Sequence, residues 1–337
     1  MNNRISSQTA QLDRRLIRGI RFIRVKGSSQ ERFKAHVALL REEILTGPVT
    51  GLARKNEWLI RKGHGLVRFS PIAQAVVLAY RHLLLPYLDS HLARQERETI
   101  QAGAEAIGLP YDMCRETLFQ PDVMMLLARF SLSQHFLPEW IPAAFPGCTS
   151  AVALKEWTRN GKLLACRNLD YPAVGHWEKN ATVVFNEPSE KGEIPYVSLT
   201  AAGVAFSGIT SMNSEGLTLS AHAHFAKEIS LRGIPIVLIG DEIIRTARTL
   251  GQAVDIARKR KTIANWSFVM SSGKENEAIV IEMTPSKVQV RNAQDGFISH
   301  TNYFHHPELR KDETLFCGGY CEDLIGRFCR IRQILEP

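Results

Sequence analysis

The residue pattern changes at Gly147, and this change limits the choice of fold more than any other feature of the sequence. Before it, apolar residues recur at helical spacing, as in residues 89–109. After it, short segments such as residues 217–225 alternate between apolar and polar residues, which is typical of strands. A helical pair at residues 234–261 separates two blocks of such strands. This order predicts antiparallel sheets covered by helices, so we expect an α+β protein with a layered αββα core.

The chain divides into three expected parts. Residues 1–21 form a basic arm that we expect to be flexible, residues 22–147 a mainly helical region, and residues 148–337 the αββα core, expected to be short at its C-terminus. The basic residues near the N-terminus are Arg4, Arg14, Arg15, Arg18, Arg21, Arg24 and Lys26. Such an arm suits an anionic partner, but no basic and aromatic pattern of a nucleic-acid module accompanies it. We therefore expect no nucleic acid partner.

Composition restricts the class of protein further. With 337 residues, 45% of them hydrophobic, the chain can bury a sizeable core. The start of the chain lacks the apolar stretch of a secretory signal, so we expect a cytoplasmic protein. The longest apolar segment, residues 71–88, is interrupted by Gln74, Arg81 and Pro86, which predicts a core helix, with peripheral membrane contact as the alternative. The six cysteines show neither a disulfide framework nor zinc-site spacing, so reduced thiols and no metal are expected.

Cys148 stands at the start of a predicted β-hairpin. Residues 151–157 and 162–168 have strand character, and a glycine-containing turn lies between them. Paired strands would bring Arg167 and Asp170 back beside Cys148. A thiol with charged neighbours is the usual setting of a reactive cysteine. The alternative is a buried cysteine in an ordinary hairpin.

The order of motifs after residue 146 resembles that of N-terminal-nucleophile (Ntn) hydrolases. The similarity is to the branch that contains choloylglycine hydrolase and acyl-coenzyme A:isopenicillin N acyltransferase. The motifs are GCTS at 147–150, RNLD at 167–170, GITSMNSEGL at 208–217, AIVIEM at 278–283, ISHTNYF at 298–304, and Arg327 in GRFCR. Residues 25–44 and 96–114 resemble the acyltransferase side of the family, although Phe33 and Val37 stand where glycines are expected. The resemblance covers about residues 22–330.

The resemblance implies a four-layer αββα sandwich and a nucleophile that becomes an N-terminus by self-cleavage. The implied cleavage site is the bond between Gly147 and Cys148, and the implied catalytic residues are Cys148, Arg167, Asp170, Asn302 and Arg327. The freed α-amine, which titrates at about 7.7–8.0 when unperturbed, would take the proton of the thiol. A glycine before the cysteine is expected to permit the strained backbone of an N→S acyl shift. No cofactor is implied.

Each remaining residue has an implied part in this chemistry. Asp170 would hold the new α-ammonium, and Arg167 would stabilise the thiolate or bind a substrate oxygen. Asn302 would donate its side-chain N–H to the developing oxyanion, and Arg327 would tie the site together. Each residue also has an ordinary structural reading, as a strand end, a turn residue or part of a helix surface.

The sequence departs from the family pattern in two places. Relatives carry an asparagine after the strand at 217–224 as a second oxyanion donor, whereas His222 or His224 occupies this region here. A neutral imidazole can donate one hydrogen bond, so we expect either histidine as an oxyanion or substrate contact. The chain also stops at Pro337, where relatives continue through further strands.

The expected function is that of a cysteine Ntn amidohydrolase or acyltransferase that forms an acyl-Cys148 intermediate. Its partner would be a linear or small amphipathic amide or another small acyl donor. The sequence does not separate hydrolysis from acyl transfer, and it leaves the oligomeric state open. The rival hypothesis is a catalytically impaired protein of the same fold that acts as a binding module. A third hypothesis is binding of an anionic surface through the basic arm.

Overall fold

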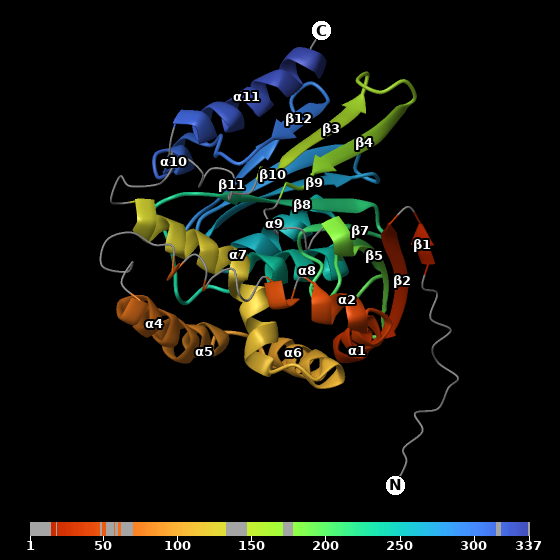
Figure 1. The fold of residues 1–337 in the computed structure, drawn as a ribbon. Helices are drawn as coiled ribbons and strands as arrows, with labels where there is room; N and C mark the ends of the chain where they lie inside the picture. Colours follow the sequence, from red (N-terminus) through yellow and green to blue (C-terminus); the bar gives the residue numbers. More distant parts are fainter. Residues whose placement is uncertain are drawn as a thin grey trace.

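The computed structural model describes residues 15–17, 19–47, 49–51, 57, 60–61, 70–132, 147–170, 178–314 and 318–335. Within these ranges the elements form four layers: helices, a large sheet, a small sheet and a covering helix (Figure 1). The layers confirm the expected α+β class and the αββα arrangement.

The large sheet is nearly all antiparallel. In spatial order its described strands are β1 (Arg15–Ile17), β2 (Ile20–Gly27), β5 (Ala181–Pro188), β6 (Tyr196–Ala201), β7 (Thr210–Asn213), β8 (Leu217–His224), β9 (Asn265–Ser272), β10 (Glu277–Met283) and β11 (Val288–Asn292). β2 and β5 form a parallel pair, in which Phe22 lies opposite Val183. The N-terminal region therefore supplies strands to the same sheet as the rest of the chain.

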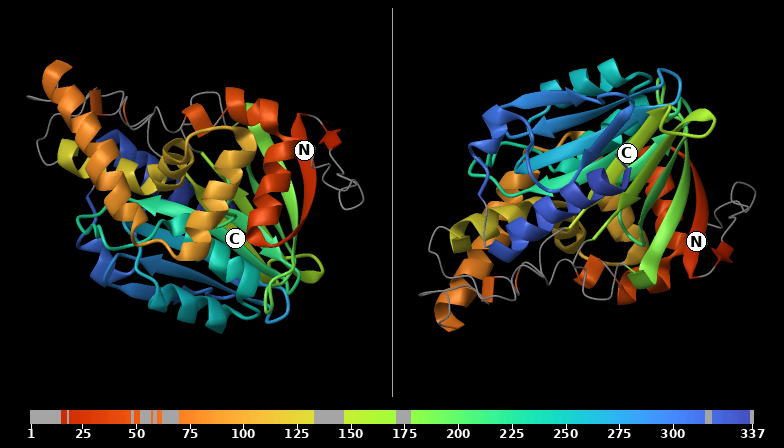
Figure 2. Two further views of the ribbon diagram at one scale, coloured as in Figure 1. Left: turned by 90° about the horizontal axis from the view of Figure 1, so that it is seen from below. Right: turned by 90° about the horizontal axis from the view of Figure 1, so that it is seen from above.

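The small sheet lies on one face of the large sheet. Its described strands are β12 (Phe297–His300), β3 (Thr149–Lys155) and β4 (Gly161–Asn168), in that order. Val152, Leu154 and Ile298 of the small sheet pack against Val269 and Val280 of the large sheet. Helix α11 (Gly318–Leu335) packs on the outer face of β12 and β3, as the view from above in Figure 2 shows.

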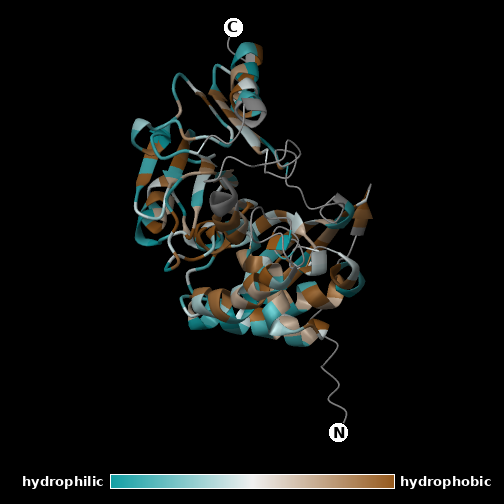
Figure 3. Ribbon diagram, turned by 60° about the vertical axis from the view of Figure 1, so that its left-hand side comes forward, coloured by the Kyte–Doolittle hydropathy of each residue, from teal (hydrophilic) through white to brown (hydrophobic). Residues whose placement is uncertain are grey.

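Helices cover the opposite face of the large sheet. They are α1 (Ser29–Leu39), α2 (Arg41–Thr46), α4 (Ser70–Ala79), the π-helical turn Tyr80–Leu84, α5 (Leu85–Asp89), α6 (Arg94–Ile107), α7 (Tyr111–Leu132), α8 (Ile236–Thr246) and α9 (Leu250–Lys259). The short elements α10 (Pro307–Arg310) and a 3₁₀ turn (Glu178–Asn180) complete the described helices. Both hydrophilic and hydrophobic residues occur on these helices (Figure 3), as expected for helices with one face on a core.

The boundaries of the N-terminal helices are set by local breaks. Leu40 separates α1 from α2, because its backbone leaves the helical conformation. The N-cap of α6 is Ala93, whose backbone N–H donates to the side chain of Glu96 at 2.6 Å. Gly108 ends α6 with a φ of 77°, the left-handed conformation that glycine adopts without cost. None of the helices in the described part of the chain is both long and apolar enough to span a membrane.

The N-terminal segment also departs from its expected form. Arg15–Ile17 pair with β2 as strand β1, and Ile20 and Arg21 belong to β2. This part of the segment expected to be a flexible arm is therefore built into the sheet. Residues 1–14 lie outside the described residues.

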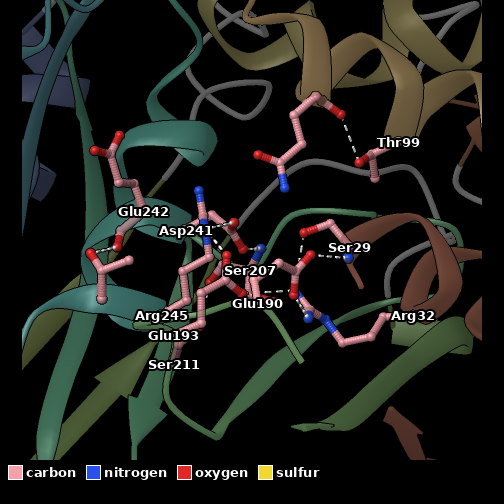
Figure 4. A network of polar contacts seen from close by, with 12 residues as sticks. Ser29, Arg32, Thr99, Glu190, Glu193, Ser207, Ser211, Asp241, Glu242 and Arg245 are labelled. Atoms are coloured by element: carbon pink, nitrogen blue, oxygen red, sulfur yellow. Dashed lines mark hydrogen bonds and ion pairs between the residues drawn. The ribbon is translucent and has the colours of Figure 1, made fainter. Parts of the chain in front are cut away.

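A partly buried network of ion pairs fastens α1 to the core (Figure 4). Arg32 of α1 contacts Glu190 at 3.0 Å and Glu193 at 3.4 Å, both in the connection between β5 and β6. Glu193 also pairs with Arg245 of α8, and Arg245 contacts Asp241 at 3.1 Å. Breaking a fully buried ion pair commonly costs about 3–5 kcal/mol, and the partial exposure of Glu190 and Arg245 lowers that cost here. The network therefore holds the helical region and the sheet in a fixed relation.

Candidate active site

The predicted hairpin is present, and it carries the candidate nucleophile. Cys148 directly precedes β3, and β3 pairs with β4 so that Ser150 lies opposite Arg167 and Thr149 opposite Asn168. This register returns the end of β4 to the start of β3. Cys148 is buried, with 2% of its surface exposed.

Asp170 and Arg327 flank the bond between Gly147 and Cys148. The backbone N–H of Gly147 donates to the backbone oxygen of Asp170 at 2.8 Å. A β-carbon placed on Gly147 would lie 3.8 Å from Asp170 Oδ2 and 3.9 Å from Arg327 Nη2. Asp170 is exposed to solvent. The two charged residues thus stand on either side of the peptide junction.

The structure does not support one sequence argument about Gly147. Its φ is not among the positive values found at other described glycines, and a β-carbon there would meet only ordinary van der Waals contacts. The backbone conformation in this state therefore does not require glycine. The expected strain is absent from this geometry.

The guanidinium of Arg167 is held beside the sulfur of Cys148. Its Nη2 lies 3.5 Å from Cys148 Sγ and donates to the backbone oxygen of Ala221 at 2.6 Å. Its Nη1 donates to the backbone oxygen of Ile209 at 2.5 Å and to the hydroxyl of Thr210. These acceptors fix the planar side chain, so its positive charge stays next to the thiol.

Arg327 joins Cys148 to Asn302. Its Nη1 donates to the backbone oxygen of Cys148 and to the hydroxyl of Thr149, both at 2.7 Å, and its Nη2 lies 3.4 Å from Asn302 Oδ1. Asp323, one turn earlier in α11, contacts Arg327 Nε at 2.9 Å. Arg327 therefore connects α11 with Cys148 and Thr149 at the start of β3.

Asn302 is buried and fixed on both sides of its amide. Its Nδ2 donates to the backbone oxygen of Ala223 at 2.9 Å, and its oxygen accepts from Arg327. A side-chain amide carries two N–H donors, so one remains for a further acceptor. This arrangement is compatible with the predicted oxyanion donor.

A mainly apolar cavity adjoins Cys148. The space in it that is open to water-sized molecules is about 70 Å³. Cys148, Arg167 and Leu169 line it from the hairpin. The other lining residues come from the helices, the large sheet and the connection between β6 and β7, and include Phe33, Ile100, Cys114, Leu118, Phe206, Ala221, Ala223, Val237 and Trp266.

Helix α7 forms one wall of this cavity, and a buried carboxyl group fixes it in place. Asp122 accepts from the indole N–H of Trp266 at 2.9 Å and from the backbone N–H of Ile236 at 3.3 Å. Burial raises the pKa of Asp122 to about 7. The helical region therefore contributes directly to the space beside the nucleophile, which the sequence patterns did not reveal.

His222 and His224 do not take the place that the sequence suggested. Ala221 and Ala223 line the cavity, whereas His222 and His224, which alternate with them on β8, face the small sheet. His222 Nε2 lies 2.8 Å from the hydroxyl of Ser150 on β3. The prediction that either histidine contacts substrate or oxyanion is therefore wrong for this conformation.

The two histidines belong instead to a buried cluster between the sheets. We define the histidine cluster as His222, His224, His300 and His305, with the carboxyl groups of Glu282 and Glu313. Two Nε2 atoms, of His224 and His300, are 3.3 Å apart, and His224 Nε2 lies 2.6 Å from the hydroxyl of Ser267. Glu282 accepts from the backbone N–H groups of His305 and His306 at 2.9 and 2.8 Å.

Burial controls the charge of this cluster. It lowers the pKa of His224 and of His305 to about 3, and lowers that of His222 and His300 well below the ordinary value. It raises the pKa of Glu313 to about 8. The imidazoles are therefore neutral at pH 7. The described residues contain no group of three or more His, Cys, Asp or Glu side chains arranged to hold a metal ion.

Asn213, in one of the family-like motifs, has a structural role. It donates to the backbone oxygens of Ile244 and Ala247 and accepts from the backbone N–H of Leu217. Cys166 is exposed on β4. Cys317 and Cys321 lie outside the residues whose side chains are described.

The layered αββα architecture is the one that the resemblance to Ntn hydrolases predicted. A sequence model of one family, described as "AAT: Acyl-coenzyme A:6-aminopenicillanic acid acyl-transferase", matches residues 157–337, more than half of the chain. The chain belongs to this family. The resemblance found in the sequence motifs is thereby confirmed.

Individual relatives are distant. A protein of Archaeoglobus fulgidus described as uncharacterized is 24% identical over 204 residues, which is 59% of this chain and 33% of that protein. The chain thus spans about a third of that relative's length. Among solved structures, penicillin V acylase from Agrobacterium tumefaciens is 17% identical with a TM-score of 0.32, covering 45% of this chain and 51% of its own. A variant of conjugated bile acid hydrolase from Clostridium perfringens is 12% identical with a TM-score of 0.29, covering 57% and 66%.

Proposed function

We propose that this protein is a cysteine Ntn amidohydrolase or acyltransferase that works through an acyl-Cys148 intermediate. The family supports an amide-hydrolysing or acyl-transferring enzyme. The single observation that supports the assignment of the nucleophile is the set of contacts around Cys148. Arg167 lies 3.5 Å from its sulfur, Arg327 binds its backbone oxygen at 2.7 Å, and Asp170 stands beside the preceding bond.

The first step would be self-cleavage. The Cys148 thiol attacks the carbonyl carbon of Gly147, a C–S bond forms, and the C–N bond breaks as the nitrogen takes a proton. Water then hydrolyses the thioester, which frees the carboxylate of Gly147 and restores the thiol. The product carries a new α-amine on Cys148, and Asp170 is close enough to the junction to hold its protonated form.

In turnover, the α-amine would take the thiol proton and the sulfur would attack the substrate carbonyl. The charge of Arg167 stabilises the sulfur once the proton has left. The remaining N–H of Asn302 would donate to the oxyanion, a contribution typically worth about 3 kcal/mol. The ammonium returns its proton to the leaving amine, and water or a second amine then resolves the acyl-cysteine.

The cavity supports the expected substrate class. Its lining beside Cys148 is mainly apolar, so it suits the apolar part of a small amphipathic amide. The leaving amine would depart on the side of the charged groups Asp170 and Arg327. A folded protein substrate would not fit such an enclosed space.

Intact mass and N-terminal sequencing of the purified protein test this function. We expect two associated fragments, the second beginning at Cys148, and a single uncleaved chain for Cys148→Ala. A folded wild-type chain that begins only at Met1 after prolonged incubation would contradict the self-cleavage. Loss of cleavage in Cys148→Ala alone would assign the reaction to the thiol.

The second candidate is a non-catalytic binding module of the same fold. One observation favours it: neither His222 nor His224 supplies the second oxyanion donor that the family pattern led us to expect. This candidate predicts ligand binding in the cavity without cleavage of the chain and without acylation of Cys148. The same mass measurement separates the two functions.

A further inference from the structure

Phe33 of α1 lies directly on a glycine of α6. A β-carbon placed on Gly103 would fall 2.0 Å from Phe33 Cε1 and 2.2 Å from Cδ1, far inside van der Waals contact. The absence of a side chain at Gly103 therefore lets the aromatic ring occupy this position. Phe33 is buried, with 7% of its surface exposed.

The ring of Phe33 stands between two cavities of different character. One is the apolar cavity that contains Cys148. The other is a polar cavity lined by Arg32, Thr99, Tyr196 and Asp241, among other residues. Phe33 and the segment 204–206 line both cavities, so they form the partition between them.

The other half of the partition is also held by α1. His36 Nε2 accepts a hydrogen bond from the backbone N–H of Gly203 at 2.9 Å. Gly203 has a φ of +88°, and a β-carbon there would lie 2.4 Å from Val49 Cγ2. The turn that carries the segment 204–206 is therefore fixed against the N-terminal helices, and the partition has little freedom to move.

We propose that Phe33, seated on Gly103, closes the end of the acyl site and sets the length of the acyl chain that the enzyme accepts. This inference rests on the proposed function, because it takes the apolar cavity beside Cys148 as the acyl site. The ligand class is an unbranched apolar acyl group. Acyl chains that reach past the partition meet the ring of Phe33 and, behind it, the buried charges of Arg32 and Asp241.

Two substitutions move the partition in opposite directions. Phe33→Ala removes the ring and lengthens the apolar cavity, so longer chains gain affinity by about fourfold for each methylene newly buried. Gly103→Ala puts a methyl group where the ring now lies, which displaces the ring toward the cavities and favours shorter chains. Phe33→Leu keeps an apolar side chain and gives a smaller shift than alanine.

Acylation of the intact protein by 4-nitrophenyl esters of straight-chain acids with about two to fourteen carbons provides the test. Attack by the sulfur forms a thioester, breaks the C–O bond and releases 4-nitrophenolate, which is measured together with the mass of the peptide that contains Cys148. We expect the longest chain that reacts efficiently to increase in Phe33→Ala and to decrease in Gly103→Ala. Val37→Ala is the matched control, since Val37 is buried on the same helix and lines neither cavity.

Equilibrium binding of the free straight-chain carboxylates, measured by calorimetry, provides a readout that needs no thiol chemistry. The same chain-length profile in the parent and in folded Phe33→Ala or Phe33→Leu would overturn the inference. An unreactive Cys148 in the parent would overturn the proposed function instead. In that case, a chain-length shift in the binding measurement would still support the partition.

Discussion

The two faces of strand β8 carry different kinds of polar chemistry. On one face, Ala221 and Ala223 border the cavity that contains Cys148. The charged group that contacts this face is Arg167, which donates to the backbone oxygen of Ala221 and is also bound by Ile209 and Thr210. On the other face, His222 and His224 belong to the histidine cluster; both are buried, as are His300 and Glu282 of the same cluster.

The two faces differ in the charge state of their side chains. An arginine stays protonated at any ordinary pH, so its positive charge near Cys148 is permanent. An imidazole loses its proton when it is desolvated, so the imidazoles of the histidine cluster are neutral and work through hydrogen bonds and packing. Reactivity is therefore expected on the cavity face, and stability that depends on pH is expected on the inter-sheet face.

Removing the thiol gives the largest expected effect on the cavity face. In Cys148→Ala, turnover of any amide substrate should fall by at least about 10⁴-fold, because the covalent route is lost. The free energy of unfolding should change by no more than about 2 kcal/mol, as only one buried sulfur is removed. Steady-state kinetics and urea unfolding measure the two quantities. Residual turnover within tenfold of the parent would place the nucleophile elsewhere.

Asn302→Ala should produce the next largest effect. We expect kcat to fall by about a hundredfold or more, the loss typical of one oxyanion donor. Circular dichroism checks that the variant is folded, since Asn302 also bonds the backbone oxygen of Ala223. His224→Gln on the opposite face is the matched control and should keep kcat at pH 7.5 within about threefold. Equal losses in both variants would remove the contrast between the faces.

Acid should destabilise the protein through the histidine cluster. Unfolded histidine titrates near a pKa of about 6.5, whereas burial lowers the pKa of His224 in the folded state to about 3. The unfolded state therefore binds more protons below pH 6.5, and stability present above that pH is lost as the pH falls toward 3. Glu313 and Asp122, with pKa values raised to about 8 and about 7, act in the opposite direction, since their stabilisation weakens as the pH rises above about 4.5.

Urea unfolding between pH 7 and pH 5 measures this loss. His224→Gln keeps a polar side chain but cannot take up the proton, so its stability should fall less steeply, by up to about 1.4 kcal/mol per pH unit. The parent and the variant are compared at the same ionic strength. Parallel pH profiles would show that His224 is not part of the acid response.

Removing an exposed ion pair should have the smallest effect on stability and turnover, so it serves as a reference for the substitutions on both faces of β8. Lys274 contacts Glu215 at the surface. Lys274→Ala should leave the free energy of unfolding unchanged within experimental error, because solvent screens the pair, and should leave turnover unchanged. A larger change would mean that surface charges contribute to stability on the scale of the buried cluster.

The strands after Gly147, and their order along the chain, were predictable because the alternation of apolar and polar residues is a local signal. The hairpin that presents Cys148 follows from two such segments and the turn between them, and Arg167 and Asp170 follow from its register. Asn302 and Arg327 were predicted as site residues from the family motifs that contain them. Their connection through one guanidinium became visible only when β12 and α11 were placed in space.

The histidine cluster and the cavity were not predictable from local patterns. His300 on β12 lies beside His224 on β8, and His305 packs against His300, so the cluster joins residues that are far apart in the chain. His222 faces the small sheet, and this could be known only after the small sheet was placed on the large one. The family pattern predicted that His222 faces the cavity, which is the wrong face of β8. Phe33 was noted as a departure from the pattern, but its part in a cavity wall depends on the packing of α1 against α6.

The parallel pairing of β2 with β5 has a consequence for refolding. β2 precedes the proposed cut at Gly147 and β5 follows it, so cleavage would leave one sheet assembled from two polypeptides. Before the cut, an unfolded molecule re-forms this pairing in a first-order reaction. After the cut, refolding requires two polypeptides to associate, so it becomes second order. The midpoint of unfolding then depends on protein concentration, and dilution favours loss of the partner fragment. The mature protein would then persist through slow unfolding, while the precursor could be rescued by simple refolding.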